Sequence, residues 1–318
     1  MIVPTICRPD ELRACLESVA AQTRPPDEVV VVLPTARGPC DKVVDEFRER
    51  LVLREDRGSE EGIVAAVNKG LVMAAGDVVC LLDDDAMAPP HWLRRVERWF
   101  RDGRVGAAAG PLVPPGKRLE DMPPTARWDA LTWFGYSYGP RNDARLLAPQ
   151  RAHFLQEGNL AFRRASIGKI DTRLVGRDER FGDDITLPLL RRGLHVVADP
   201  ELFAWHAHVR FAFEPERVPA HDHVYASAHN QTYLWLKHFP PWRRPIFLAF
   251  GLLVGDRTVK GFGAFLVWVL RNVRRPARAR AILRLVAPTL RGRLDGLRTY
   301  RAMRRSSDQA GPRDSPNP

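Results

Sequence analysis

Residues 76–85 read GDVVCLLDDD, an apolar run that ends abruptly in three carboxylates. The run is typical of a strand that is buried on both faces of a sheet. Before it, residues 60–75 repeat apolar side chains at helical spacing, and Gly76 is the residue type that commonly ends a helix. The stretch therefore predicts a helix that leads into a buried strand, with acidic groups at the carboxyl end of that strand.

The same alternation of strand and helix occurs upstream. Residues 1–5 and 27–33 have the composition of strands. Between them we expect a helix from Pro9, because acidic residues occupy its first turn and apolar residues follow at positions i, i+3, i+4 and i+7. Strands separated by helical crossovers predict a mostly parallel, Rossmann-like α/β sheet flanked by helices. Ligands bind outside the carboxyl ends of the strands in such sheets, where residues 83–85 fall.

The rest of the chain divides by composition. Residues 111–150 are rich in Pro, Gly and aromatic residues, which predicts a loop-rich connection before strand and helix patterns resume. From about residue 216 the pattern is helical, and the polar end of the chain is expected to be disordered. The regions that we expect are 1–110, 111–212, 213–305 (a helical extension) and 306–318 (a disordered tail).

The cysteines bear on the redox environment. Cys7, Cys15, Cys40 and Cys80 form no Cys-x-x-Cys pair, and three of them lie in apolar or helical stretches. This pattern predicts buried thiols in a reducing compartment, with neither a disulfide framework nor a zinc site. Residues 1–5 are interpreted as a strand and not as a signal peptide.

The three aspartates favour a metal site. Adjacent carboxylates repel one another, so bringing them together costs free energy unless a cation compensates. Asp83 and Asp85 point the same way if the segment is extended, and Mg²⁺ or Mn²⁺ accepts carboxylate and phosphate oxygens together. The alternative interpretation is a solvated acidic turn that caps a helix beginning near Pro89.

Two later groups could take part in chemistry. Asp183 and Asp184 precede an apolar helical pattern, so they either cap that helix or supply a general base. Pro188 cannot donate a hydrogen bond to the carbonyl of Asp184, so we expect the helix to start late or to be distorted. His206 and His208 end a predicted strand and could add a metal ligand, although a histidine pair is more often structural.

The order of these motifs resembles that of the family-2 inverting glycosyltransferases, which have the GT-A fold. Each motif is weak alone, but the set extends over roughly residues 1–210 in one order. The matching segments are 4–8 (PTICR), 16–23 (LESVAAQT), 68–70 (NKG), 76–85 (GDVVCLLDDD), 158–164 (GNLAFRR), 182–193 (GDDITLPLLRRG) and 205–206 (WH).

The resemblance implies that residues 1–110 form the nucleotide-sugar-binding half of the domain and residues 111–212 the acceptor-binding half with the catalytic base. It also implies roles for individual residues. Asp85, with His206, would bind the Mg²⁺ or Mn²⁺ that bridges the donor diphosphate, and Asp184 would be the catalytic base. The residues implied to bind the nucleotide sugar are Pro4, Thr5, Arg8, Asn68, Asp83 and Asp84, and those on the acceptor side are Gly158, Asn159 and Asp183. The implied reaction transfers a hexosyl or deoxyhexosyl group from a nucleotide-diphosphate sugar to a glycan or lipid-linked acceptor, with inversion, in polysaccharide biosynthesis.

The sequence departs from the family pattern at two points. The family usually carries an acidic pair after its second strand, and the first acid commonly contacts the base. Here residues 33–36 read LPTA, so we expect nucleobase recognition to differ. Only residues 1–3 precede the first motif, where the family has several apolar residues, which leaves open a start further upstream.

The C-terminal quarter carries the basic excess. Residues 237–318 contain 18 Lys and Arg but only four Asp and Glu. The apolar runs 245–255 and 261–270 are each shorter than the roughly 20 residues that span a bilayer. An interfacial helix or hairpin on anionic membrane is favoured over a soluble helical subdomain, with the arginines of 271–280 facing the headgroups. The expected location is cytoplasmic and peripheral, at the inner face of the cell membrane.

Other classes of protein fit less well. A sequence pI of about 10.1 also suggests nucleic acid, but the arginines flank apolar runs and no binding motif occurs, so no nucleic-acid partner is expected. A non-catalytic relative that binds nucleotides or glycans is the other alternative, and it would not need Asp184, because binding alone requires no base. A nucleotidyltransferase would need a Gly-rich loop with a basic residue, which residues 4–10 lack.

Overall fold

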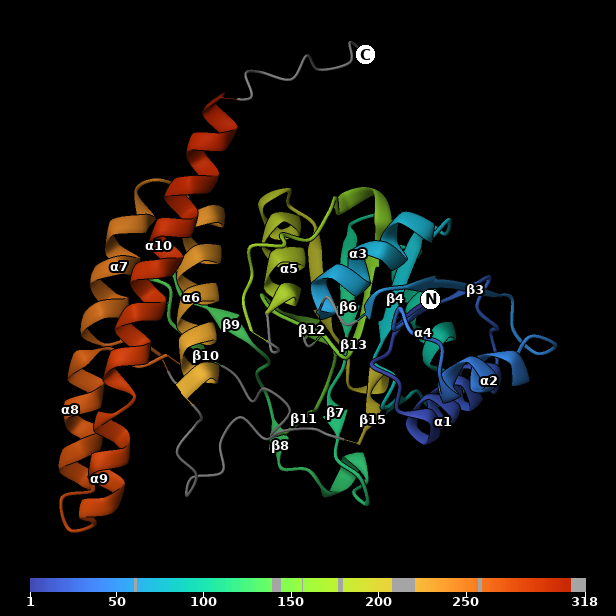
Figure 1. The fold of residues 1–318 in the computed structure, drawn as a ribbon, viewed down its shortest axis with the longest axis horizontal. Helices are drawn as coiled ribbons and strands as arrows, with labels where there is room; N and C mark the ends of the chain where they lie inside the picture. The colour runs from blue at the N-terminus through green and yellow to red at the C-terminus, as the bar shows by residue number, and fades with distance from the viewer. Residues whose placement is uncertain are drawn as a thin grey trace. The chain divides into compact units, whose positions relative to one another are not determined.

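The computed structural model describes residues 1–59, 62–138, 144–155, 157–176, 180–207, 221–256 and 259–309. The chain forms two compact units (Figure 1). The first unit comprises residues 1–131, 137–172 and 181–215, and the second comprises residues 132–136, 173–180 and 216–318.

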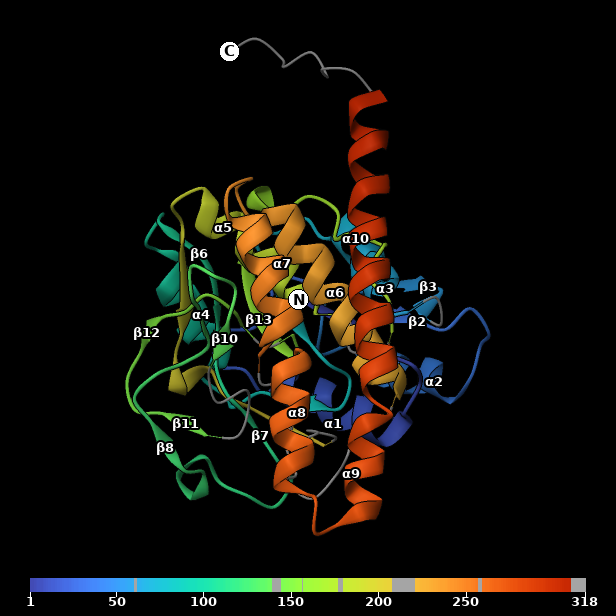
Figure 2. The same ribbon diagram turned by 90° about the vertical axis from the view of Figure 1, so that its left-hand side faces the viewer.

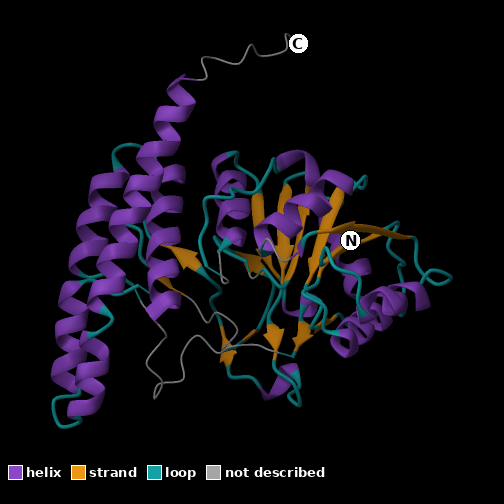
Figure 3. Ribbon diagram, in the orientation of Figure 1, coloured by secondary structure: helices purple, strands orange, loops and turns teal. Residues whose placement is uncertain are grey.

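The first unit is built on an eight-stranded mixed sheet (Figure 3). Its strands are β1 (Ile2–Pro4), β2 (Val29–Leu33), β3 (Leu53–Arg57), β4 (Val78–Leu82), β6 (Val105–Ala109), β12 (Gln150–Arg151), β13 (Asn159–Arg163) and β14 (His195–Ala198). Their order across the sheet is β12-β14-β6-β13-β4-β1-β2-β3. Strands β1 to β4 pair in parallel, whereas β13 runs antiparallel between β4 and β6. Strands from the predicted halves 1–110 and 111–212 therefore share a single sheet.

Helices cover both faces of this sheet, as the α/β class requires. They are α1 (Pro9–Ala20), α2 (Pro39–Glu46), α3 (Ile63–Met73), α4 (Trp92–Phe100) and α5 (Phe181–Arg191). Helices α1, α2 and α4 bury their apolar stripes on one face, over side chains that include Val3 and Val31. Helix α3 lies against Ile2, whose side chain points to the opposite face. The fold class predicted from the sequence, a GT-A-like sheet flanked by helices, is confirmed.

Short elements complete the first unit. A three-stranded sheet has the order β5 (Ala86–Met87), β15 (Ala204–His206) and β7 (Leu112–Val113). The pairs β8 (Pro124–Thr125) with β11 (Arg145–Leu146) and β9 (Ala130–Leu131) with β10 (Ser137–Tyr138) lie in the connection predicted to be loop-rich. Short 3-10 helices that lie wholly within the described residues are η2 (Leu119–Asp121), η3 (Arg164–Ser166) and η4 (Pro200–Leu202).

The second unit is helical, as the sequence predicts for the region after residue 216. Its helices are α6 (His221–His238), α7 (Arg243–Leu253), α8 (Phe262–Arg271), α9 (Pro276–Leu283) and α10 (Val286–Gln309). Helices α6 and α10 lie side by side (Figures 1 and 2). Gly296 of α10 makes this possible, because a Cβ atom there would lie 2.5 Å from the carbonyl oxygen of His229.

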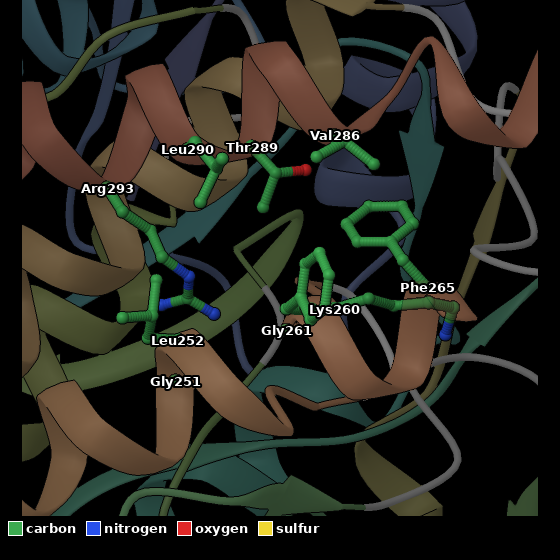
Figure 4. A pocket seen from close by; sticks show the side chains of 10 residues that line it. Gly251, Leu252, Lys260, Gly261, Phe265, Val286, Thr289, Leu290 and Arg293 are labelled. Carbon is green, nitrogen blue, oxygen red and sulfur yellow. The ribbon is translucent and has the colours of Figure 1, made fainter. Parts of the chain in front are cut away.

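Arg293 of α10 closes the space between α7, α8 and α10 (Figure 4). Its Nη2 donates to the carbonyl of Val259 at 3.1 Å. Burial lowers the pKa of Arg293 to about 10, against the opposing charge of Asp256, so the side chain stays protonated at neutral pH. The cavity left beside it measures about 10 Å³, which is about the room that one water molecule needs. This part of the second unit therefore holds no ligand-sized site.

Three predictions about the fold were wrong. Cys7 and Cys40 form a disulfide with their Cα atoms 5.6 Å apart, because the segments after β1 and β2 meet where these adjacent strands end. Cys15 and Cys80 are buried thiols, as expected, and burial raises the pKa of Cys80 to about 11. The argument for a reducing compartment thus loses its support.

The other two corrections concern helix ends. Helix α5 starts at Phe181, before the two acids, and it continues through Pro188, although the proline nitrogen cannot donate a hydrogen bond to the carbonyl of Asp184. Helix α10 runs to Gln309, so residues 306–309 are helical and not a disordered tail. The remainder of that predicted tail, 310–318, lies outside the described residues.

Candidate active site

Two carboxylates and an imidazole converge at the carboxyl end of β4. One ligand atom from each of Asp83, Asp85 and His206 lies within 4.8 Å of the others. The Nε2 atom of His206 is 3.1 Å from Oδ2 of Asp83 and 3.4 Å from Oδ1 of Asp85. The side chain of Asp83 is 31% exposed, whereas that of Asp85 is 3% exposed. The cluster is thus open to solvent on the Asp83 side and closed behind Asp85.

The small three-stranded sheet brings His206 to this position. Strand β15 pairs antiparallel with β5, so that His206 lies opposite Ala86, the residue that follows Asp85. The backbone N–H of Ala207 donates to the carbonyl of Asp85 at 2.8 Å. A histidine 123 residues away in the sequence is therefore fixed beside the acidic motif by backbone pairing. His208, its proposed companion, lies outside the described residues.

The electrostatics of the cluster favour a bound cation. Burial acts to lower the pKa of His206, but the hydrogen bond to Asp83 and the charges of Asp83 and Asp85 outweigh it and raise the pKa. Carboxylate oxygens with one imidazole nitrogen form a donor set that suits Mn²⁺ and, less strongly, Mg²⁺. The residues of this site therefore fit the divalent ion that the family resemblance implies.

Asp84 serves a different purpose from its neighbours. Its carboxylate accepts a hydrogen bond from Thr5 Oγ1 at 2.5 Å and forms an ion pair with Arg8. Arg8 also donates from Nη1 to Oδ2 of Asp85 at 2.9 Å. Burial raises the pKa of Asp84, opposed by the bonds from Arg8 and Thr5. Asp84 thus ties the loop after β1, which follows Pro4, to the acidic motif, and Arg8 orients Asp85.

Two predicted site residues use their side-chain amides for hydrogen bonds to other parts of the protein. Asn159 is fully buried, its Oδ1 accepts from Trp92 Nε1 at 2.9 Å, and its amide nitrogen donates to the carbonyl of Leu202. Asn68 uses both ends of its amide on the backbone of Ile170, at 2.9 and 2.8 Å. Neither amide is directed to a ligand in this arrangement, and both hold elements of the site together.

The segment before β13 connects the metal-ligand cluster to helix α5. A Cβ atom at Gly158 would lie 2.7 Å from Oδ2 of Asp83 and 3.1 Å from the ring of His206, so any larger residue there would displace these two side chains. On the other side, the backbone N–H of Gly182 donates to Glu157 Oε1 at 3.2 Å. The first turn of α5 is therefore joined to the cluster through two consecutive residues, 157 and 158.

The first turn of α5 carries the candidate base. Asp183 and Asp184 are 5% and 7% exposed, and the backbone N–H of Asp171 donates to Oδ2 of Asp184 at 3.0 Å. Sequence reasoning missed Glu157 and Asp171, which carry no recognisable motif. Only the position of Glu157 beside the expected Gly158 could have drawn attention to it.

Comparisons with known proteins show the family of the chain. The chain matches the model of glycosyl transferase family 2 over residues 1–171, and it belongs to this family. Over 117 residues it is 32% identical to the glucosyl-dolichyl phosphate glucuronosyltransferase of Haloferax volcanii and 37% identical to an uncharacterized glycosyltransferase of Haemophilus influenzae. Each match covers 36% of this chain, and they cover 37% and 44% of the two relatives, so less than half of either relative is matched.

Solved structures of glycosyltransferases share the fold. The mannosyltransferase PcManGT from Pyrobaculum calidifontis, in complex with GDP-Man and Mn²⁺, is similar with 18% identity and a TM-score of 0.53, over 93% of this chain and 86% of that one. S. aureus TarS 1–349 in complex with UDP-GlcNAc is similar with 17% identity and a TM-score of 0.56, over 97% and 91%. These likenesses confirm the GT-A fold.

Proposed function

We propose that this chain is a metal-dependent inverting glycosyltransferase. It would transfer a hexosyl or deoxyhexosyl group from a nucleotide-diphosphate sugar to a glycan or lipid-linked acceptor. The observation that carries the proposal is the convergence of Asp83, Asp85 and His206 at the carboxyl end of β4. The complexes of PcManGT with GDP-Man and Mn²⁺ and of TarS with UDP-GlcNAc support a nucleotide-sugar donor on this fold.

The residues of the site would have separate roles. Asp85 and His206 would hold Mn²⁺ or Mg²⁺, with Asp83 at the open side of the cluster. When bound, the ion supplies charge neutralisation for a departing nucleoside diphosphate. Arg8 holds Asp85 from behind through its bond to Oδ2. The loop of Pro4 and Thr5, fixed by Asp84, would border the nucleotide.

Asp184 is the proposed general base. It lies in the first turn of α5, which is joined to the metal-ligand cluster through Gly182, Glu157 and Gly158, and its Oδ2 is oriented by the N–H of Asp171. One base that removes the proton of an acceptor hydroxyl is sufficient for a single displacement, which inverts the configuration of the sugar. Asp184→Asn should retain donor binding and lose transfer by a factor on the order of 10²–10⁴. Transfer at the wild-type rate would reduce Asp184 to a helix cap.

The metal prediction can be tested without a known acceptor. We expect Mn²⁺ binding, followed by the electron paramagnetic resonance of the free ion, to be lost in Asp85→Ala. The matched control is Asp10→Asn, which neutralises a carboxylate that is 98% exposed on α1. Affinity for a nucleoside diphosphate, measured by calorimetry, should fall when EDTA replaces Mn²⁺. Equal Mn²⁺ affinity in Asp85→Ala and the wild type would contradict the assignment.

The second unit is proposed to dock on anionic membrane at the inner face of the cell membrane. The outward side of α8 is apolar, since Phe262, Leu266 and Leu270 are exposed at 53–63%. The exposed Arg271, Arg274, Arg275 and Arg280 follow directly. Apolar side chains beside a basic cluster match the headgroup boundary of an anionic leaflet. Among the described residues, no helix is both long and apolar enough to cross a bilayer.

Co-sedimentation with vesicles tests this docking. The full chain should bind phosphatidylglycerol vesicles more strongly than phosphatidylcholine vesicles, and added salt should weaken the binding. Leu266→Glu should reduce it, whereas Leu147→Glu, at a leucine that is 56% exposed in the first unit, should not. Failure of the full chain to sediment with anionic vesicles at low salt would favour a soluble acceptor.

A further inference from the structure

Strand β12 forms one edge of the eight-stranded sheet of the first unit (Figure 2). A larger cavity lies beside this strand. Its volume is about 450 Å³, which is within the range of small-molecule sites. Strands β12 and β14, the segment 127–130 and the end of α5 line it. Every residue that lines it belongs to the first unit.

The cavity is separate from the candidate active site. Helix α5 carries Asp184 in its first turn, whereas Leu190 and the following Gly193 border the cavity at its other end. At a rise of 1.5 Å per residue, the six residues from Asp184 to Leu190 within α5 span about 9 Å. A group bound in the cavity therefore lies too far from Asp184 to react, and it would serve as an anchor.

The side chains around the cavity are basic and aromatic. Arg127, Arg151, His153 and His195 line it, and none of the residues that line it is acidic. Nη2 of Arg151 and Nε2 of His195 are only 2.8 Å apart. The carboxylate of Asp102 interacts electrostatically with His195, but Arg104 already binds that carboxylate. The cavity thus favours an anion.

Aromatic side chains add a second kind of contact. Trp128 lines the cavity and is 2% exposed, and among the described residues its Nε1 has no hydrogen-bond partner. A buried N–H group without an acceptor costs free energy, which a hydroxyl oxygen of a ligand would recover. Tyr138 is half-buried and offers a ring for apolar contact with a sugar, and Gln150 offers a further amide.

We propose that this cavity binds an acidic saccharide unit, a sugar that bears a carboxylate or a phosphate group. Arg127 and Arg151 bind the anionic group, while Trp128 and Tyr138 contact the sugar. Such a site anchors a glycan at a distance from the point of transfer. It needs neither the metal ion nor a nucleotide, so it stands independently of the proposed reaction.

Calorimetric titration of the full chain in EDTA tests the proposal. The probes are glucuronic acid and glucose 6-phosphate, with glucose and inorganic phosphate as partial ligands. At least one acidic sugar should bind about tenfold more tightly than both glucose and inorganic phosphate, because each partial ligand loses one set of contacts. Phosphate that binds as tightly as both acidic sugars would indicate an anion site without sugar recognition, and would overturn the proposal.

Two variants locate the binding. Arg151 is exposed, so Arg151→Gln should leave folding intact. This variant is expected to bind the acidic sugar at least tenfold more weakly. Trp128→Phe keeps an aromatic ring and removes the N–H group. It should reduce the affinity for the acidic sugar more than it reduces the affinity for phosphate. The control is Arg101→Gln, an exposed arginine that does not line the cavity. Equal affinity in Arg151→Gln and the wild type, or no binding of either acidic sugar at about 10 mM, would overturn the assignment. Because EDTA removes the metal, these outcomes are distinct from those of the Mn²⁺ experiment.

Discussion

Replacing Asn68 with alanine would show how the protein holds the segment beside its candidate base. Asn68 is 7% exposed on α3, and its amide donates to the carbonyl and accepts from the N–H of Ile170. Asn68→Ala leaves both of these backbone groups buried without a partner. At about 1–3 kcal/mol for each of the two unsatisfied groups, the free energy of unfolding should fall by about 2–6 kcal/mol, a large share of the about 5–15 kcal/mol typical of folded proteins.

Urea unfolding followed by circular dichroism measures this loss. The midpoint should fall while the slope of free energy against urea stays the same, because the exposed surface does not change. Val72→Ala is the matched control on the same helix. Val72 is 88% exposed, so this substitution should change the free energy of unfolding by less than about 0.5 kcal/mol. Asn68→Ala should also slow glycosyl transfer, because Asp171, which is next to Ile170, orients Asp184. Equal midpoints for Asn68→Ala and Val72→Ala would refute the reasoning.

Three other substitutions test separate features. Cys40→Ser removes the disulfide to Cys7, which closes a loop of 33 residues. Chain entropy predicts that the free energy of unfolding falls by about 3–4 kcal/mol, so the variant should melt at a lower temperature than the wild type, and a reductant should remove this difference. Gly70→Ala places a Cβ atom 2.5 Å from Ile2 Cγ2, so melting should show a loss of about 1–3 kcal/mol, whereas Gly103→Ala, with no atom within 4 Å, should not. Gly158→Ala pushes on Asp83 and His206 and should weaken Mn²⁺ binding; unchanged affinity would show that the ligands can move aside.

Local patterns were sufficient to predict the framework. The apolar run at 78–82 and the helical spacing before it correspond to β4 and α3, because burial of a strand or of one helix face imposes a period that is written in consecutive residues. The position of Asp83 to Asp85 at the end of that strand followed from the same pattern. The family membership, expected from the ordered motifs, is confirmed by the match over residues 1–171.

Motif position was a weaker guide to what each side chain does. Asn68, Asn159 and Asp84 lie in segments that resemble family motifs, yet their polar atoms bond to the backbone of Ile170, to Trp92 and Leu202, and to Thr5 and Arg8. A buried polar group needs a partner, and nothing in the neighbouring sequence says which one it finds. Whether they also contact a ligand stays a prediction.

The sequence by itself thus determined the fold class, the strands and helices within residues 1–33 and 60–85, and the acidic motif, since each depends on residues near one another in the chain. Helix α2 and strand β3, which lie between these two segments, were not predicted. Only the tertiary structure decided which distant residues meet. The pairing of β15 with β5 brings His206 to Asp83 across 123 positions, and the ends of β1 and β2 bring Cys7 to Cys40. The basic cavity likewise gathers residues from 127 to 196. Such contacts depend on which strands become neighbours and in which register, and that is fixed by packing of the whole sheet.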